Sequence, residues 1–166
     1  VLMIDIKEEY VDRGMVTIQK SLSKLVSKER ISQSDADDTL ARISTTTDRA
    51  ECADVDLVVE AVPEILDLKT SIFSELDEIC KPECILASNT SSISISTIAN
   101  ATNRPEKVIG MHFMNPVPIM KLVEIINGDQ TSEATNSAVV EAAEKMGKIA
   151  LSCNDSPGFV SNRILC

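Results

Sequence analysis

The chain has 166 residues, of which 43% are hydrophobic, so it is long enough to bury a core as a globular protein. Its 16 basic and 26 acidic residues give a net charge of −10 at pH 7, which argues against general binding to a nucleic-acid backbone. The sequence has no apolar run near the roughly 20 residues of a membrane span and no recognisable signal peptide.

Hydrophobic periodicity and turn residues predict twelve elements. In chain order we expect a strand over 1–6, helices over 7–30 and about 34–41, a strand over 43–47, a strand over 56–63, a helix over 64–80, a strand over 84–87, a helix over 94–101, strands over 107–112 and 121–126, a helix over 131–146 and a strand over 148–152.

Strands that alternate with helices predict an α/β fold with a mostly parallel sheet. The two closely spaced strands on either side of the Pro-containing loop at 115–118 are candidates for an antiparallel ribbon. With three Phe, one Tyr and no Trp, aliphatic side chains must fill the core, as is typical of parallel sheets.

The cysteines are odd in number and form no CxxC pair: Cys52, Cys80, Cys84, Cys153 and Cys166. We therefore expect thiols in a reducing intracellular compartment, such as the cytoplasm, a peroxisome or the mitochondrial matrix, rather than disulfides. No metal site is expected.

The ends of the chain indicate a fragment of a longer protein. The sequence begins without Met inside an apolar run, Val1 to Ile4, and stops as another apolar segment begins. We expect missing sequence at both ends.

The single histidine, His112, ends a predicted strand, and Glu124 follows it by twelve residues on the next one. Histidine titrates near neutrality, and a carboxylate that fixes its ring can make it a proton acceptor. A lone histidine is more often a hydrogen-bonded core or surface residue, so both interpretations stand on this pattern alone.

Ligands of open parallel sheets bind beyond the carboxyl ends of the strands. Asp5 follows the first strand, where an acid either contacts the ribose of NAD or is simply solvated. Glu64 and Lys69 begin the helix after the Glu60-Ala61-Val62-Pro63 turn and either face a ligand or are ordinary surface charges. Ser91 and its neighbours either donate hydroxyl hydrogen bonds to a carbonyl or simply cap the following helix, although five polar residues in a row exceed what one cap requires.

A glycine-rich phosphate-binding turn, GxGxxG, is not visible in the sequence and would precede residue 1. The nearest glycine, Gly14, lies within the first predicted helix and does not belong to such a loop.

Three segments together closely resemble the L-3-hydroxyacyl-CoA dehydrogenase family, which includes 3-hydroxybutyryl-CoA dehydrogenases. They are Ser88-Asn89-Thr90-Ser91-Ser92, the run from His112 to Glu124 (HFMNPVPIMKLVE), and the run from Asp155 to Arg163 (DSPGFVSNR). The resemblance extends over essentially the whole chain in order and spacing.

The resemblance implies oxidation of (S)-3-hydroxyacyl-CoA to 3-oxoacyl-CoA with NAD, in fatty-acid metabolism. His112 would be the general base and Glu124 its partner, while Ser91 and Asn162 would position the substrate and assist catalysis. The NAD-contacting positions would be Asp5, the backbone near Ala61, Glu64, Lys69, Ser91 and Asn115. In the first helix, Ser21 and Lys28 match residues that hold coenzyme A, and Lys28 supplies positive charge on an acidic protein.

By the same resemblance, residues 1–154 form a Rossmann-like NAD-binding domain that lacks its first strand and glycine-rich loop. Residues 155–166 are a linker and the start of a helical C-terminal domain that forms most of a homodimer interface. We expect the complete protein to be the enzyme and the fragment to be inactive.

Three alternatives remain open. The chain could come from an L-gulonate 3-dehydrogenase of the lambda-crystallin type, which shares the His and Glu arrangement. It could be a non-catalytic truncated product. It could also be the dehydrogenase part of a multifunctional β-oxidation protein with a hydratase domain upstream.

Overall fold

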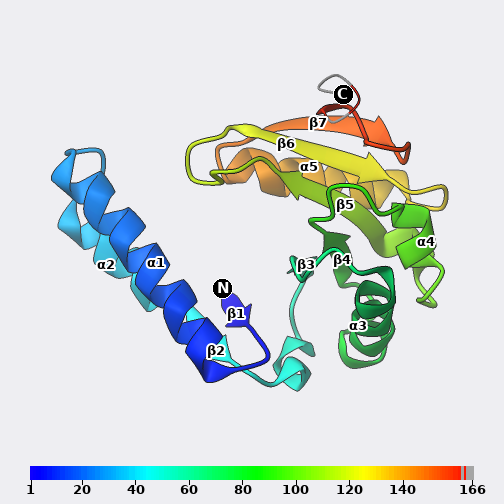
Figure 1. Cartoon of the computed structure of the whole chain (residues 1–166), viewed down its shortest axis with the longest axis horizontal. Coiled ribbons are helices and arrows are strands. Elements are labelled where there is room, and N and C mark those ends of the chain that lie inside the picture. Colours follow the sequence, from blue (N-terminus) through cyan, green and yellow to red (C-terminus); the bar gives the residue numbers. More distant parts are fainter. Residues whose placement is uncertain (162, 164–166) are drawn as a thin grey trace. The chain divides into compact units, whose positions relative to one another are not determined.

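The computed structural model describes residues 1–161 and 163 and divides the chain into two compact units, Val1–Cys52 and Ala53–Cys166. Their elements are coloured and labelled in Figure 1.

The first unit contains two helices and a two-stranded parallel sheet (Figure 1). Its elements are β1 (Leu2–Ile4), α1 (Glu8–Ser27), α2 (Gln33–Ala41), β2 (Ser44–Thr46) and the 3₁₀ helix η1 (Arg49–Cys52). The α2 helix begins with a capping box, in which Ser32 and Asp35 each bind the other's backbone N–H.

The α1 helix ends three residues before the predicted boundary at residue 30. The reason is a Schellman motif, in which Glu29 has a φ of 54° and its N–H donates to the Val26 carbonyl. The Arg30 N–H donates to the Leu25 carbonyl at 3.0 Å, so the last carbonyls are satisfied and the chain reverses. Lys28 is the residue that caps this helix end.

The second unit is a five-stranded sheet with the order β3-β4-β5-β6-β7, in which every neighbouring pair is parallel except β5 and β6. Its elements are β3 (Leu57–Glu60), α3 (Leu66–Ile79), β4 (Ile85–Ser88), α4 (Ile95–Ala99), η2 (Pro105–Lys107), β5 (Val108–Phe113), β6 (Leu122–Asn127), α5 (Glu133–Lys145) and β7 (Ile149–Asn154). The predicted α/β class, mostly parallel sheet and antiparallel ribbon are confirmed.

The β5 strand separates two packed faces, because successive side chains of a strand point to opposite sides. Ile109 and Met111 belong to a fully buried cluster with Val139 and Ala143 of α5. The intervening residue, Gly110, faces Ile126 of β6 and Ile95 of α4. His112 shares the Gly110 face, so the fold places it on the α4 side of the sheet.

The close packing at Gly110 leaves no room for a side chain. A Cβ there would lie 2.8 Å from Ile126 Cβ and 3.0 Å from Ile95 Cδ1. We expect Gly110→Ala to destabilise the chain by about 1–3 kcal/mol, because an added methyl forces the strand and α4 apart. Thermal unfolding followed by circular dichroism measures the effect.

Gly14→Ala is the matched control, since the same methyl in the middle of α1 would meet only the flexible end of the Met3 side chain. Alanine there is expected to be neutral or stabilising, because glycine is unfavourable inside a helix. A midpoint for Gly110→Ala at or above that of the parent chain would contradict the packing argument.

Candidate active site

The site is built around His112, the penultimate residue of β5 and 7% exposed. The antiparallel register of β5 and β6 places His112 directly opposite Glu124, as it places Gly110 opposite Ile126. Opposed side chains of an antiparallel pair lie on the same face and within reach of each other. His112 Nδ1 accordingly lies 2.8 Å from Glu124 Oε2.

Glu124 is fully buried, yet its carboxylate is surrounded by donors. Oε2 faces His112 Nδ1 and accepts from the Ser161 hydroxyl at 2.9 Å, while Oε1 accepts from the backbone N–H groups of Val160 at 3.1 Å and Ser161 at 2.7 Å. Burial by itself would raise the pKa of Glu124, but these hydrogen bonds outweigh it and hold the pKa below its usual value. The carboxylate is therefore ionised at neutral pH.

An ionised carboxylate only accepts hydrogen bonds, so His112 Nδ1 must carry the proton that it shares with Glu124. In a neutral imidazole the other nitrogen, Nε2, is then an acceptor. The network thus assigns the tautomer of a general base with its lone pair on Nε2.

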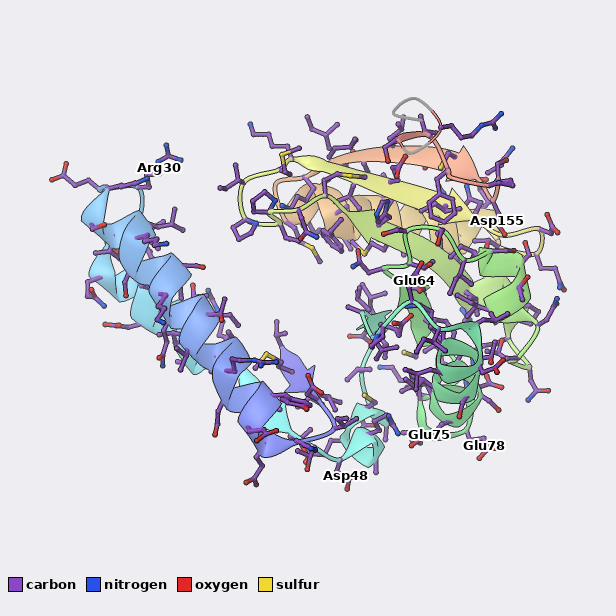
Figure 2. All side chains as sticks on the ribbon, viewed as in Figure 1. Arg30, Asp48, Glu64, Glu75, Glu78 and Asp155 are labelled. Atoms are coloured by element: carbon purple, nitrogen blue, oxygen red, sulfur yellow. The ribbon has the colours of Figure 1, made fainter. Side chains whose placement is uncertain are left out.

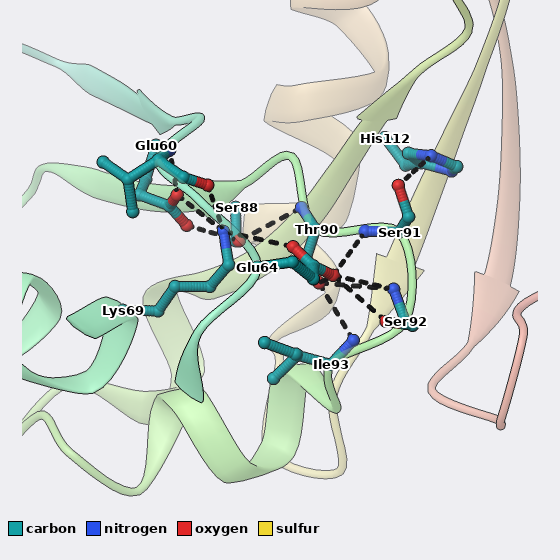
Figure 3. A network of polar contacts seen from close by, with 10 residues as sticks. Glu60, Glu64, Lys69, Ser88, Thr90, Ser91, Ser92, Ile93 and His112 are labelled. Carbon is teal, nitrogen blue, oxygen red and sulfur yellow. Dashed lines mark hydrogen bonds and ion pairs between the residues drawn. The ribbon is translucent and has the colours of Figure 1, made fainter. Parts of the chain in front are cut away.

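Ser91 approaches that lone pair. Its Oγ lies 3.1 Å from His112 Nε2, and with the tautomer above the hydroxyl donates. Figure 3 shows the Ser91 side chain pointing from the β4–α4 loop toward the ring. Ser91 is exposed, so a ligand that approaches the nitrogen also meets this hydroxyl.

Glu64 fixes the loop that carries Ser91. Its Oε1 accepts from the backbone N–H groups of Ser91 at 2.9 Å and Ser92 at 3.1 Å, and also from the hydroxyls of Thr90 and Ser92 (Figure 3). Burial would raise the pKa of Glu64, but these hydrogen bonds and the charge of Lys69 lower it to about 2. The prediction placed Glu64 in a helix, whereas α3 begins at Leu66 and Glu64 lies in the preceding turn.

Lys69 is 1% exposed, and oxygens of its own chain surround its ammonium group. Its Nζ lies 2.7 Å from Glu60 Oε1, 3.1 Å from the Val62 carbonyl and 3.4 Å from Glu64 Oε2. Glu60 is also buried, and its Oε2 accepts from the Ser88 hydroxyl at 2.7 Å. The three charges link the end of β3 to the end of β4 and to the Ser91 loop (Figure 3).

Two further polar residues join the loop to the sheet and to the end of β7. Asn89 accepts from the Phe113 N–H at 2.8 Å through Oδ1 and donates its own N–H to the Glu60 carbonyl at 2.7 Å. Asp155, labelled in Figure 2, accepts from the Ser94 hydroxyl at 2.7 Å and the Ser96 N–H at 2.9 Å, at the start of α4.

The other predicted site residues are distributed over both units. Ala61 follows β3 and Asn115 follows β5, and both are exposed. Asp5, Ser21 and Lys28 belong to the first unit, where Asp5 is exposed after β1, Ser21 is half-buried on α1 and Lys28 is exposed at its end. Asn162 lies outside the described residues.

Sequence reasoning missed Glu60, Thr90 and Ser161. An acid at the end of a β-branched strand was a usable signal for Glu60, because a charge in a buried strand needs a partner. Thr90 was visible only as a member of the polar cluster. Nothing in the sequence pattern connects Ser161 to Glu124.

Two cysteines of the second unit have raised pKa values. Burial and the neighbouring Cys84 raise the pKa of Cys80 to about 12, and burial with the charges of Glu124 and Asp155 raises that of Cys153 to about 11, so neither is a thiolate at neutral pH. The described residues contain no group of three or more His, Cys, Asp or Glu side chains that could hold a metal ion.

In the same part of the chain, no helix has the length and apolar character that crossing a membrane requires.

Comparisons with known proteins match nearly the whole chain. A family model described as 3-hydroxyacyl-CoA dehydrogenase, NAD binding domain, matches residues 1–156. A probable 3-hydroxybutyryl-CoA dehydrogenase of Deinococcus radiodurans is 57% identical over 166 residues, which cover 99% of this chain and 59% of that protein. The fatty acid oxidation complex subunit alpha of Psychrobacter cryohalolentis is 45% identical, with 99% of this chain matching 23% of the subunit.

Among solved structures, the (S)-3-hydroxybutyryl-CoA dehydrogenase PaaH1 of Ralstonia eutropha aligns with a TM-score of 0.98 at 45% identity, covering 100% of this chain and 59% of that one. The chain thus spans about three fifths of the two 3-hydroxybutyryl-CoA dehydrogenases compared here. Because the family model matches residues 1–156, well over half of the chain, the chain belongs to the 3-hydroxyacyl-CoA dehydrogenase family and matches its NAD-binding domain.

Proposed function

We propose that the protein to which this chain belongs is an NAD-dependent 3-hydroxyacyl-CoA dehydrogenase that oxidises (S)-3-hydroxyacyl-CoA to 3-oxoacyl-CoA. The observation that carries the proposal is the ring of His112, held between the ionised carboxylate of Glu124 at 2.8 Å and the hydroxyl of Ser91 at 3.1 Å. The names of the relatives from Deinococcus and Ralstonia support the substrate class.

In this proposal His112 Nε2 removes the proton of the substrate 3-hydroxyl. Bound NAD supplies the acceptor for the hydride that leaves C3 of the same substrate. The substrate thus loses one proton and one hydride and becomes the 3-oxo product. Glu124 stabilises the imidazolium that forms, and the Ser91 hydroxyl is available to hydrogen-bond the substrate oxygen.

The residues present fit a nicotinamide dinucleotide. The β3 and β4 strands are parallel, so their carboxyl ends bring Ala61 and the Ser91 loop to one edge of the sheet, where ligands of this fold class bind. We propose that the backbone at Ala61, the Ser91 loop and Asn115 contact NAD. Asp5, which follows β1, suits the ribose hydroxyls of NAD and disfavours a 2′-phosphate.

Lys69 and Glu64 are proposed to support the cofactor site by holding the loop that carries Ser91. Because internal oxygens surround the Lys69 ammonium, we propose that Lys69 acts on the cofactor mainly through Glu64 and the loop that Glu64 holds. Ser21 and Lys28 are the proposed contacts to coenzyme A, whose phosphates would meet the exposed Lys28 ammonium.

The complete protein is proposed to add the parts that the family resemblance implies. Within the described residues β1 pairs with β2, and β3 pairs with β4. The resemblance implies a further strand that is followed by a glycine-rich turn. Asn162 and a helical C-terminal domain after residue 154 would close over the acyl chain and support a homodimer. We propose a reducing intracellular compartment, which is supported by Cys80 and Cys153 forming no disulfide within the described part of the chain.

A substrate comparison separates this function from its rival of the same fold. The complete protein is expected to oxidise NADH with acetoacetyl-CoA and to show no turnover of L-gulonate with NAD. The reverse result would identify a sugar-acid dehydrogenase. No turnover of either substrate would favour a non-catalytic product.

Replacing the base tests the mechanism. We expect His112→Gln in the complete protein to lower kcat by about 10²–10⁴, because glutamine cannot accept the proton. NADH binding, followed by fluorescence titration, should be nearly unchanged. An equal loss of cofactor affinity would show that His112 organises the fold rather than the chemistry.

Removing the charge of Glu64 tests how the Ser91 loop is held. The pKa of Glu64 is about 2 when folded against 4.5 ordinarily, so its contribution to stability is complete above pH 4.5 and disappears as the pH falls toward 2. At pH 7 we expect Glu64→Gln to unfold at a lower urea concentration than the parent. The difference between the two urea midpoints should disappear between pH 5 and pH 2.5.

Glu141→Gln is the matched control for this substitution. Glu141 also has a lowered pKa from its pair with Lys145, but both side chains are well exposed on α5, where such pairs contribute little. Two results would contradict the role of Glu64 in holding the Ser91 loop. One is a decrease in the urea midpoint for Glu64→Gln that stays constant down to pH 2.5, and the other is a decrease no larger than that for Glu141→Gln.

A further inference from the structure

The segment after β7 returns to the sheet and donates hydrogen bonds to Glu124, the residue that pairs with His112. Gly158 has a φ of 76° and Phe159 a φ of 49°, so the chain turns sharply here. Phe159 is 2% exposed and meets the His112 ring edge-on at 6.0 Å between centroids. Beyond it, the Val160 and Ser161 N–H groups and the Ser161 hydroxyl all donate to Glu124.

The two carboxylate oxygens of Glu124 are held in different ways. Among the described residues, Oε1 accepts from the two backbone N–H groups alone, and these donors survive any non-proline side chain at position 161. Oε2 is shared between the His112 Nδ1–H at 2.8 Å and the Ser161 hydroxyl at 2.9 Å. Of the donors in the described part of this segment, the hydroxyl is therefore the one that competes directly with the imidazole for the negative charge of Oε2.

The contacts to Oε1 and Oε2 each have a physical effect on the ring. Rotation of the carboxylate out of its plane would break the bonds to Val160 and Ser161 together, so the oxygen that faces Nδ1 is fixed in place. A second donor on Oε2 also disperses its charge and weakens its pull on the imidazole proton. The second effect depends on the side chain of a residue 37 positions after Glu124 in the sequence.

We propose that Ser161 is a positioning residue that orients Glu124 and lowers the proton affinity of His112. Its consequence for catalysis rests on the proposed function, whereas its effect on the ring does not. By holding Glu124, Ser161 links the segment after β7 to the chemistry at β5. If Ser161 only stabilised the turn at 158–161, it would affect folding but would leave the ring unchanged.

The single histidine makes this effect directly measurable. In the 166-residue chain grown with ¹⁵N- and ¹³C-labelled histidine, every imidazole signal belongs to His112, so its titration and tautomer are read by NMR without ligand or turnover. We expect Ser161→Ala to move the titration midpoint upward by about half a pH unit, a threefold gain in proton affinity, because Oε2 then serves the ring alone.

Three further variants make the test specific. Ser161→Thr keeps the hydroxyl and should return the parent midpoint. Ser161→Cys, with a weaker donor of similar size, should move the midpoint in the same direction by less, and it replaces the alanine variant if that one does not fold. Ser152→Ala on β7 removes a hydroxyl that contacts Asn136 rather than the site, and it should leave the ring unchanged.

An unchanged midpoint in Ser161→Ala or Ser161→Cys, with only a lower unfolding midpoint, would overturn the proposal and leave Ser161 as a fold residue. An equal movement in Ser152→Ala would overturn it as well. The proposed function fails separately: a complete parent protein without dehydrogenase activity would refute that function and leave the NMR result on Ser161 intact.

Discussion

The structure depends on the satisfaction of two buried carboxylates, those of Glu60 and Glu124. A buried carboxylate is strongly destabilising unless it is fully hydrogen-bonded or paired. Glu60 meets this requirement with Lys69 and Ser88, and Glu124 meets it with His112, Val160 and Ser161. Because these donors come from different strands, turns and helices, the requirement fixes how the ends of β3, β4, β5 and β6 lie relative to one another.

The networks around Glu124 and around Glu60, Lys69 and Glu64 lie at opposite nitrogens of the His112 ring. Glu124 faces Nδ1, and the chain from Lys69 through Glu64 to the Ser91 loop faces Nε2. In both, an acid binds backbone N–H groups as well as side chains, so the geometry does not rely on long, flexible side chains alone. This explains why buried residues such as Glu60, Lys69 and Glu124 take part in a site that has a single imidazole.

Much of the second unit could be predicted from sequence because each strand and helix carries its own period. The sequence pattern placed His112 and Glu124 on neighbouring strands, and the family resemblance implied that they pair. The observed register places them directly opposite each other. The burial of Lys69 was missed because no partner was assigned to Glu60, although an acid at the end of a buried strand signals that one is needed. The contact of Ser161 could not be predicted, since it needs the left-handed turn at Gly158 and Phe159.

The glycine in the middle of β5 connects the core to the proposed chemistry. Because position 110 lacks a side chain, α4 approaches the sheet closely enough for Ile95 to occupy the space beside Ile126. The loop that carries Ser91 leads directly into this helix, so the depth at which α4 sits bears on the separation of 3.1 Å between the hydroxyl and His112 Nε2. In mutational surveys, position 110 should therefore behave like a residue of the site, although it contacts none of the reacting atoms. Sequence variation there would be restricted by activity as well as by stability.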